Sequence, residues 1–237
     1  MTTHDQKVAL ITGGSRGIGA GIVAGYHRLG WAVVAVSRSV KPSEDPAIVN
    51  VAGDVSDPIA ADRIVRAAMD TFGRLDTLVN NAGLFVAKPF ADYTSDDYAA
   101  MIKVNLGGFF AMTQRAIAEM VKQGSGHVVN ITTTLADYAN SATPAALTAL
   151  TKGGLASATK SLAIEYASHG IRVNAVSPGT IQTPEYPPES YDGLAALQPI
   201  GRVGKVGDVV DGILFLESSP FITGEILHID GGQIAGH

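Results

Sequence analysis

The sequence contains no cysteine and only one tryptophan, and aromatic residues make up 6% of its 237 positions. Without cysteine the chain has no disulfide, no thiolate nucleophile and no thiolate metal ligand. It also lacks an apolar run long enough to cross a membrane, and the run at residues 8–11 is too short for the core of a signal peptide. We therefore expect a cytoplasmic protein with no membrane partner.

Charge is also scarce, and it is slightly negative. Charged residues make up 16% of the chain, and the formal net charge is -5. Nucleic-acid binding needs clustered lysine and arginine, so we expect no nucleic-acid partner. The six histidines are scattered, with none paired at the three- or four-residue spacing of a helical metal site, so we expect no metal.

What the sequence does have is a regular alternation of short β-branched runs with longer segments of helical period. The runs that read as strands are residues 8–11, 32–37, 48–52, 78–80, 127–131, 172–177 and 225–229. The helix-like segments are residues 17–29, 58–72, 95–121, 145–167 and 208–217. This alternation predicts an α/β protein, one domain over residues 1–237, whose mostly parallel sheet carries helices on both faces.

One region interrupts that alternation. Residues 184–199 read PEYPPESYDGLAALQP and lie between two predicted strands. Long proline-rich connections in compact domains are often functional, so we predict a substrate lid here. An ordinary surface loop is the alternative.

A glycine-rich turn joins the first predicted strand to the first predicted helix. Its glycines are Gly13, Gly14, Gly17 and Gly19. Glycines permit a tight turn and close backbone approach to a pyrophosphate, whose oxygens can then accept from the N–H groups of the helix N-terminus. A strand before the turn and a helix after it favour dinucleotide binding.

The spacing of Thr12, Gly13, Gly17 and Gly19 resembles that of the short-chain dehydrogenase/reductase family. Further matches follow in order along the chain: Asp54 with Val55; Asn80, Asn81, Ala82 and Gly83; Asn105; Thr151, Lys152 and Gly153; Ser177, Pro178 and Gly179; Thr183 with Pro184; Ile222, Thr223 and Gly224; and Asp230, Gly231 and Gly232. The resemblance implies a single doubly wound Rossmann-type domain of about seven parallel strands, a homotetramer or homodimer, and a small-molecule alcohol or carbonyl substrate.

The resemblance also implies which residues hold the dinucleotide. They are Gly13, Ser15, Arg16, Gly17, Ile18, Gly19, Ser37, Arg38, Asp54, Val55, Asn81, Ala82, Gly83, Lys152, Pro178, Gly179, Ile181 and Thr183. An NAD site usually has an acidic residue at the end of the second strand, where it accepts from the ribose 2'-hydroxyl. This chain has Ser37 and Arg38 there, and Arg38, with Arg16 from the glycine turn, can bind a 2'-phosphate. We therefore expect NADP(H) in preference to NAD(H).

The catalytic residues depart from the family pattern. The family uses Ser, Tyr and Lys, with the tyrosine one helical turn before the lysine, so that the ammonium lowers the pKa of the phenol. Lys152 is present, and Asn105 matches the family's asparagine, but Thr148 stands at the tyrosine position. Thr133 is the best match to the serine. The interval from Thr133 to Thr148 is longer than the family usually shows, so Thr134 is an alternative.

An aliphatic hydroxyl is a poor proton donor, so the source of the proton stays open between water, Thr148, Tyr138, Tyr186 and Tyr191. Two functions follow. One is an NADP-dependent oxidoreductase that transfers a hydride between nicotinamide and an alcohol or ketone, with an altered proton donor. The other is a catalytically impaired dinucleotide-binding protein, a sensor or assembly partner. Other chemistry on the same fold, such as that of a lyase or epimerase, is a third reading.

Overall fold

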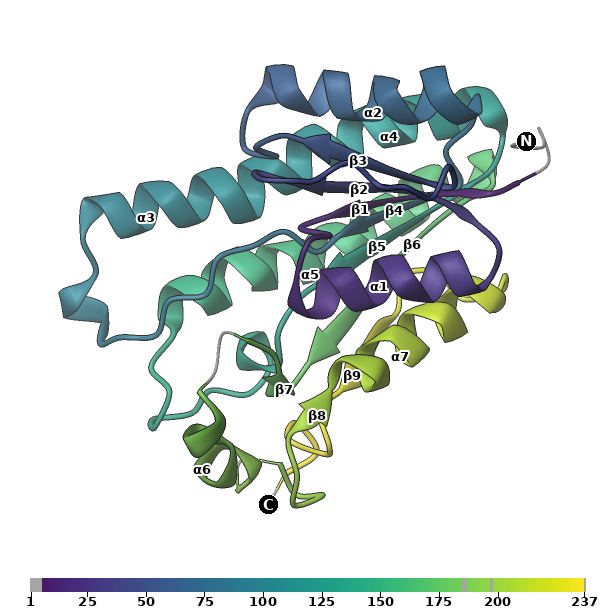
Figure 1. Ribbon diagram of the computed structural model, residues 1–237. Helices are drawn as coiled ribbons and strands as arrows, with labels where there is room; N and C mark the ends of the chain where they lie inside the picture. Colours follow the sequence, from purple (N-terminus) through teal and green to yellow (C-terminus); the bar gives the residue numbers. More distant parts are fainter. Residues whose placement is uncertain (1–5, 185–186, 197, 237) are drawn as a thin grey trace.

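In the computed structural model, which describes residues 6–184, 187–196 and 198–236, seven parallel strands form one sheet (Figure 1). The sheet order is β3-β2-β1-β4-β5-β6-β9. The strands are β1 (Val8–Thr12), β2 (Ala32–Ser37), β3 (Ile48–Ala52), β4 (Thr77–Asn80), β5 (Gly126–Ile131), β6 (Ile171–Pro178) and β9 (Ile226–Ile229). The strand order reverses between β1 and β4, where doubly wound sheets bind their ligands. The predicted fold class is confirmed.

Helices cover both faces of the sheet, as expected. They are α1 (Gly17–Arg28), α2 (Pro58–Phe72), α3 (Ser95–Met101), α4 (Phe109–Gln123), α5 (Ala146–Tyr166), α6 (Tyr191–Ala195) and α7 (Val206–Ser218). One core cluster joins α2, α4 and α5 to the sheet, and a second joins α1 and α7. Successive residues of β1 alternate between them: Val8 and Leu10 lie in the first cluster and Ala9 and Ile11 in the second. A strand buried on both faces must be apolar throughout.

Local sequence signals set several helix ends. The side chain of Asp57 accepts from the backbone N–H of Ile59, and Pro58 is the first residue of α2. The helix ends at Gly73, whose φ of 74° favours glycine. Gly170, which follows α5 and a short 3-10 turn, likewise has a φ of 71°. These caps explain why the predicted helix bounds fall within a few residues of the structure.

The predicted helix 95–121 is continuous but not uniform. It starts at α3 with a capping box formed by Thr94 and Asp97, and it continues to α4 through a π-helical stretch, Ile102–Gly108. Hydrophobic periodicity does not encode such a wide turn. π-Helical turns are frequent at functional sites, and this one carries Asn105.

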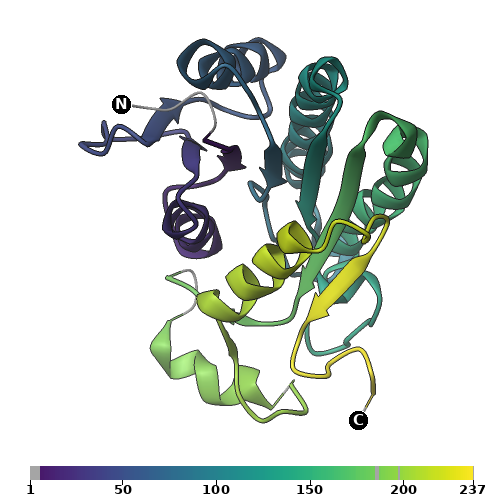
Figure 2. The same ribbon diagram turned by 90° about the vertical axis from the view of Figure 1, so that its right-hand side faces the viewer.

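The connection after β6 contains a second small sheet that the sequence did not predict. Strands β7 (Ile181–Gln182) and β8 (Gly204–Lys205) pair in parallel. The predicted lid 184–199 lies between them and includes α6, whereas Tyr186 lies outside the described residues. In both views α6 lies at the same end of the molecule as the C-terminal segment (Figures 1 and 2). Within the described part of the chain, no helix is long and apolar enough to cross a membrane.

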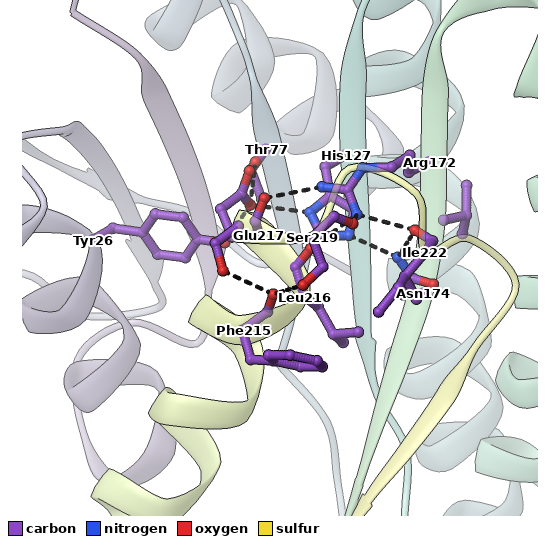
Figure 3. A network of polar contacts seen from close by, with 12 residues as sticks. Tyr26, Thr77, His127, Arg172, Asn174, Phe215, Leu216, Glu217, Ser219 and Ile222 are labelled. Atoms are coloured by element: carbon purple, nitrogen blue, oxygen red, sulfur yellow. Dashed lines mark hydrogen bonds and ion pairs between the residues drawn. The ribbon is translucent and has the colours of Figure 1, made fainter.

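The amino ends of the strands enclose a buried polar network centred on Glu217, near the end of α7 (Figure 3). One carboxylate oxygen, Oε2, accepts from the Tyr26 hydroxyl at 2.8 Å, the Thr77 hydroxyl at 2.8 Å and Nδ1 of His127 at 3.0 Å. Tyr26 comes from α1, Thr77 from β4 and His127 from β5. The network therefore joins α1 and α7 to the central strands.

The partners of Asn174 fix the proton on His127. Asn174 Oδ1 accepts from the Glu225 backbone N–H at 3.0 Å, so its Nδ2 is the atom that lies 3.1 Å from His127 Nε2. Nε2 must accept, and the proton of a neutral imidazole is on Nδ1, facing Glu217. Burial lowers the pKa of His127 accordingly.

Arg172 closes the same network from β6. Its Nη1 donates to the carbonyl oxygens of Leu216, Ser219 and Ile222 at 2.9, 3.3 and 3.1 Å. These carbonyls lie at and after the end of α7, where the last C=O groups of a helix have no N–H partner within the helix. Arg172 thereby fastens the end of α7 to the sheet.

Candidate active site

The glycine turn and the loop after β4 are joined through one threonine. The Thr12 hydroxyl donates to the Val79 carbonyl at 3.2 Å and accepts from the backbone N–H groups of Asn81 and Ala82 at 2.9 and 3.0 Å. Asn81 Nδ2 donates in return to the Thr12 carbonyl at 2.9 Å. The two loops that flank the strand-order reversal are thus one unit.

Gly17 and Gly19 are among the positions of the turn that require glycine. Gly17 has a φ of 54°, and a Cβ at Gly19 would overlap the Gly13 carbonyl oxygen. Arg16 caps α1 with extended backbone, so the helix begins at the turn and presents its unpaired N–H groups there. A Cβ at Gly17 would lie 3.6 Å from Thr183 Cγ2, which places the start of the connection after β6 against the turn. Ser15 and Arg16 are exposed, and Ile18 is half-buried.

The ends of β2 and β3 carry the predicted ribose and adenine contacts. Arg38 is exposed directly after β2, and Ser37 donates to the Ser39 carbonyl at 2.8 Å. Asp54 Oδ1 accepts from both the hydroxyl and the N–H of Ser56. These bonds lower the pKa of Asp54, and the nearby cations of Lys103 and Arg38 lower it further.

Val55, the partner of Asp54 in the predicted adenine contact, is buried. A Cβ at Gly108 would lie 2.9 Å from Val55 Cγ2, so the end of the π-helical stretch packs directly on Val55. This contact positions the loop after β3 against the helix that carries Asn105.

Lys152 and Asn105 meet beside Gly83. Lys152 Nζ donates to the Thr132 carbonyl at 3.1 Å, and a Cβ at Gly83 would lie 3.9 Å from that nitrogen and 3.3 Å from Asn105 Oδ1. Asn105 is itself held by the backbone of Leu84, since its Oδ1 accepts from the Leu84 N–H at 2.7 Å and its Nδ2 donates to the Leu84 carbonyl at 3.0 Å. Residues far apart in sequence are therefore brought together at this place.

Thr148 lies one turn before Lys152 on α5, but its hydroxyl is already occupied. It donates to the Val86 carbonyl at 3.2 Å and accepts from the Val86 N–H at 3.4 Å, and its side chain is fully buried. The Tyr93 hydroxyl donates to the same carbonyl at 2.8 Å. The loop after β4 thus lies directly against the position where the family has its tyrosine.

The two candidate threonines after β5 differ in their surroundings. Thr133 is half-buried, and its hydroxyl accepts from the Leu135 N–H at 3.4 Å. Thr134 is 2% exposed and donates to Gln233 Oε1 at 3.0 Å. The Thr133 hydroxyl can therefore still donate to a further partner, whereas the Thr134 hydroxyl already donates to Gln233 in the C-terminal segment.

The loop after β6 carries the remaining predicted contacts. Gly179 donates its N–H to the Ile229 carbonyl at 3.0 Å, and Pro178 and Ile181 are buried. Among the tyrosine alternatives, Tyr191 donates to the Thr183 carbonyl at 3.2 Å, and Tyr138 is half-buried.

Sequence reasoning missed three residues of this site. Gln198 and Gln233, both 3% exposed, and the backbone of Val86 take part in it, yet no motif or period marks them. Only the burial of two glutamines could have singled them out, and burial is not visible in the sequence.

The chain matches known proteins along nearly its whole length. A family model described as enoyl-(acyl carrier protein) reductase matches residues 13–233. The 3-oxoacyl-[acyl-carrier-protein] reductase FabG of Thermotoga maritima is 35% identical over 249 residues, which cover 97% of this chain and 98% of the relative.

Solved structures agree. ElxO with NADP bound has a TM-score of 0.91 at 31% identity, covering 98% of this chain and 100% of that one. The 3-ketoacyl-(acyl-carrier-protein) reductase of Brucella melitensis complexed with NADH has a TM-score of 0.90 at 32% identity, with the same coverage of both chains. The chain belongs to the short-chain dehydrogenase/reductase family.

Proposed function

We propose that this protein is an NADP-dependent oxidoreductase that transfers a hydride between nicotinamide and a small alcohol or ketone. The observation that carries the proposal is the meeting of Lys152, Asn105 and the Thr132 carbonyl beside Gly83, at the carboxyl ends of β4 and β5. That place adjoins the glycine turn, so a dinucleotide held there would extend toward Lys152. The relatives named above are reductases, which supports the same reaction type.

When bound, the cofactor would supply or accept the hydride, and residues of this chain would hold the cofactor in place. The glycine turn with Ser15, Arg16 and Ile18 would bind the pyrophosphate, and Asp54 and Val55 the adenine. The ribose and nicotinamide contacts would come from Asn81, Ala82, Gly83, Lys152, Pro178, Gly179, Ile181 and Thr183. The donors available fit an anionic dinucleotide, because the start of α1 and Arg16 meet at one turn.

NADP is the proposed form because of the charge at the end of β2. Ser37 and Arg38 stand where an NAD site would have an acid, and Arg38 is exposed. A guanidinium binds phosphate by charge-assisted hydrogen bonds.

The proton would not come from Thr148 in the usual way. Both roles of its hydroxyl are taken by Val86, and an aliphatic alcohol lacks the acidity of a phenol. We propose that the family's tyrosine is absent here and that Lys152 with water, or one of Tyr138, Tyr186 and Tyr191, supplies the proton. Thr133 would hold the substrate oxygen, and residues 184–199 would cover the substrate.

NADPH consumption against a panel of ketones and aldehydes tests the proposal. We expect turnover that Lys152→Ala abolishes, and a Tyr→Phe change at 138, 186 or 191 that removes most of it if a loop tyrosine is the acid. Loss of a general acid costs about 10²- to 10⁴-fold in rate. Tight NADPH binding without turnover of any carbonyl would contradict the proposal.

That last outcome would favour the second candidate, a dinucleotide-binding protein without turnover. The observation in its favour is the burial of Thr148 beneath Val86, which leaves the tyrosine position without an accessible hydroxyl. In that case Lys152→Ala should weaken NADPH binding and change nothing else.

We also propose a homodimer or homotetramer in the cytoplasm. Phe110 on α4 and Leu150 and Ile164 on α5 are 63%, 62% and 80% exposed, and a partner subunit would bury them. Light scattering that gives the mass of one chain would contradict this.

A further inference from the structure

We infer that Gln233 is a positioning residue that fixes the distance between the two loops on which the proposed reaction depends. These loops follow the neighbouring strands β5 and β6. The first carries Thr133, which would hold the substrate oxygen, and the second carries Gly179, on the nicotinamide side. The inference rests on the proposed function for its kinetic part only.

The sheet aligns the two loops only as far as the ladder between the strands extends. The last pair of the β5–β6 ladder is Ile131 with Val176, and one further bond runs from the Thr132 N–H to the Val176 carbonyl at 2.9 Å. The Thr132 hydroxyl donates to that same carbonyl at 3.1 Å. Beyond this point no backbone bond among the described residues joins the two loops, so side chains must hold them in register.

A pair of buried glutamines does this. Gln233 Oε1 accepts from the Thr134 hydroxyl at 3.0 Å and from Gln198 Nε2 at 3.4 Å. Gln198 lies directly on the second loop, since a Cβ at Gly179 would overlap its Oε1. The contacts therefore run from Thr134, beside Thr133, through Gln233 and Gln198 to Gly179.

The C-terminal turn that carries Gln233 is itself held by hydrogen bonds. Both carboxylate oxygens of Asp230 accept backbone N–H groups of this turn, from Gly232 and Ile234, each at 2.9 Å. The Gln198 side is fastened as well, because the Ile200 N–H donates to the Gly231 carbonyl at 3.0 Å. These bonds hold the backbone on either side of the glutamine pair.

The contacts among these three side chains matter energetically because the side chains are buried. Thr134, Gln198 and Gln233 are 2%, 3% and 3% exposed, so water cannot readily replace a lost partner. A buried polar group that loses its partner is costly, and the loops would shift to satisfy it. Hydride transfer is sensitive to small displacements between donor and acceptor, so such a shift would lower kcat more than it weakens cofactor binding.

The test compares Gln233→Leu, which removes the acceptor, with Gln233→Glu, which keeps one. The control is Gln123→Leu, because the Gln123 side chain makes hydrogen bonds too, to the backbone of Leu75 at the opposite end of the sheet. For Gln233→Leu we expect kcat for a ketone to fall roughly three- to tenfold, with a smaller change in the NADPH Kd. Gln233→Glu should restore most of the rate, and Gln123→Leu should lower stability alone.

Hydrogen exchange measured by mass spectrometry decides the question without relying on turnover. In Gln233→Leu, exchange should rise in peptides covering residues 132–137 and 178–184 and stay unchanged in β1 and β4. Thr134→Val should produce the same pattern, and the double variant should add nothing further. If these peptides exchange as in the wild type, or change equally in Gln123→Leu, the inference is wrong. If exchange rises but no carbonyl is turned over by the wild type, the inference stands and the proposed function fails.

Discussion

The two ends of the central sheet are built from similar polar residues but arranged in opposite ways. At the amino ends of the strands, Glu217, His127 and Arg172 satisfy one another and the nearby backbone (Figure 3). At the carboxyl ends, Arg38 and Ser15 are exposed, and the start of α1 presents unpaired N–H groups. A polar group whose partners are all internal contributes to stability, and one that is left accessible can bind a ligand. The comparison therefore predicts that substitutions at the two ends have separable effects.

The largest effect is expected from Glu217→Leu. This change leaves the Tyr26, Thr77 and His127 donors without their shared acceptor, and each buried unsatisfied group costs about 1–3 kcal/mol. We expect the free energy of unfolding in urea to fall by about 3–5 kcal/mol, with an unchanged NADPH Kd in the folded protein. The control is Glu119→Leu, which breaks only the surface pair with Lys122 and should cost under about 1 kcal/mol. Equal losses in the two variants would contradict the assignment of the network as a stabilising unit.

The next effect is a pH dependence confined to the same end. Burial lowers the pKa of His127 below its value in the unfolded chain, so the unfolded chain binds the additional proton first. Stability is therefore fully present above about pH 6.5 and is lost as the pH falls below it, by up to about 1.4 kcal/mol per pH unit.

Urea unfolding of wild type and His127→Leu between pH 7.5 and 5 checks this. The variant should be less stable at pH 7.5, but its stability should fall less steeply with acid.

Glu217 extends the pH dependence of stability to lower pH. Burial raises the pKa of Glu217, but the bonds from His127, Tyr26 and Thr77 outweigh it, and the net pKa is lowered. A second loss of stability should follow below about pH 4.5, Glu217 being the group protonated there.

Arg38→Asp sharpens the comparison from the carboxyl end. An acid at this position repels a 2'-phosphate and can accept from a ribose hydroxyl, so the preference for NADPH over NADH should reverse by roughly tenfold or more. The free energy of unfolding should stay within about 0.5 kcal/mol of wild type, as for most surface changes. Fluorescence titration with both dinucleotides measures the preference, and Arg66→Asp on α2 is the control for net charge. A preference unchanged by Arg38→Asp would remove Arg38 from the site.

The smallest effect is expected from Thr148→Val, although we propose that the residue stands where the family has its tyrosine. The change keeps the volume and removes the bonds to Val86, which should cost about 1 kcal/mol of stability. We expect kcat to change less than threefold, because Thr148 is not the proposed proton donor. A hundredfold fall in kcat would instead identify Thr148 as the proton donor.

Thr148→Tyr is the more demanding version of the same test. It restores the phenol one turn before Lys152 and would raise turnover by up to about 10²- to 10⁴-fold if the ring found room. The burial of Thr148 against Val86 implies that the loop after β4 must first move, at a cost of about 1–3 kcal/mol. Turnover and melting temperature should be measured together, and removing the Tyr93 hydroxyl with Tyr93→Phe should ease the movement.

Much of the fold could be predicted because it depends on local patterns. Apolar runs such as that of β1 mark strands buried on both faces, and Asp57 with Pro58 marks the start of α2. The glycine turn could be placed for the same reason, since its backbone conformation requires glycine at Gly17. The π-helical stretch and the pairing of β7 with β8 could not be predicted, because both arise from tertiary packing.

The same distinction, between local sequence patterns and tertiary packing, applies to the candidate site. Lys152 and Asn105 could be predicted from motifs, and the structure brings them together beside Gly83. The hydroxyl partner of Thr148 and the role of Gln233 could not be foreseen, because Val86 contributes through its backbone and Gln233 through burial. Neither property leaves a pattern in a single sequence.

The position of Glu217 also sets when the network can form during synthesis. Tyr26 and Glu217 are 191 residues apart, so the Tyr26 hydroxyl has no carboxylate partner until 191 further residues have been made. At a translation rate of about 5–20 residues per second, that delay is on the order of 10–40 s. A nascent chain that stops before α7 lacks the acceptor for Tyr26, Thr77 and His127 alike. Closure of the amino end of the sheet therefore has to follow the synthesis of α7, whichever of the three donors is considered.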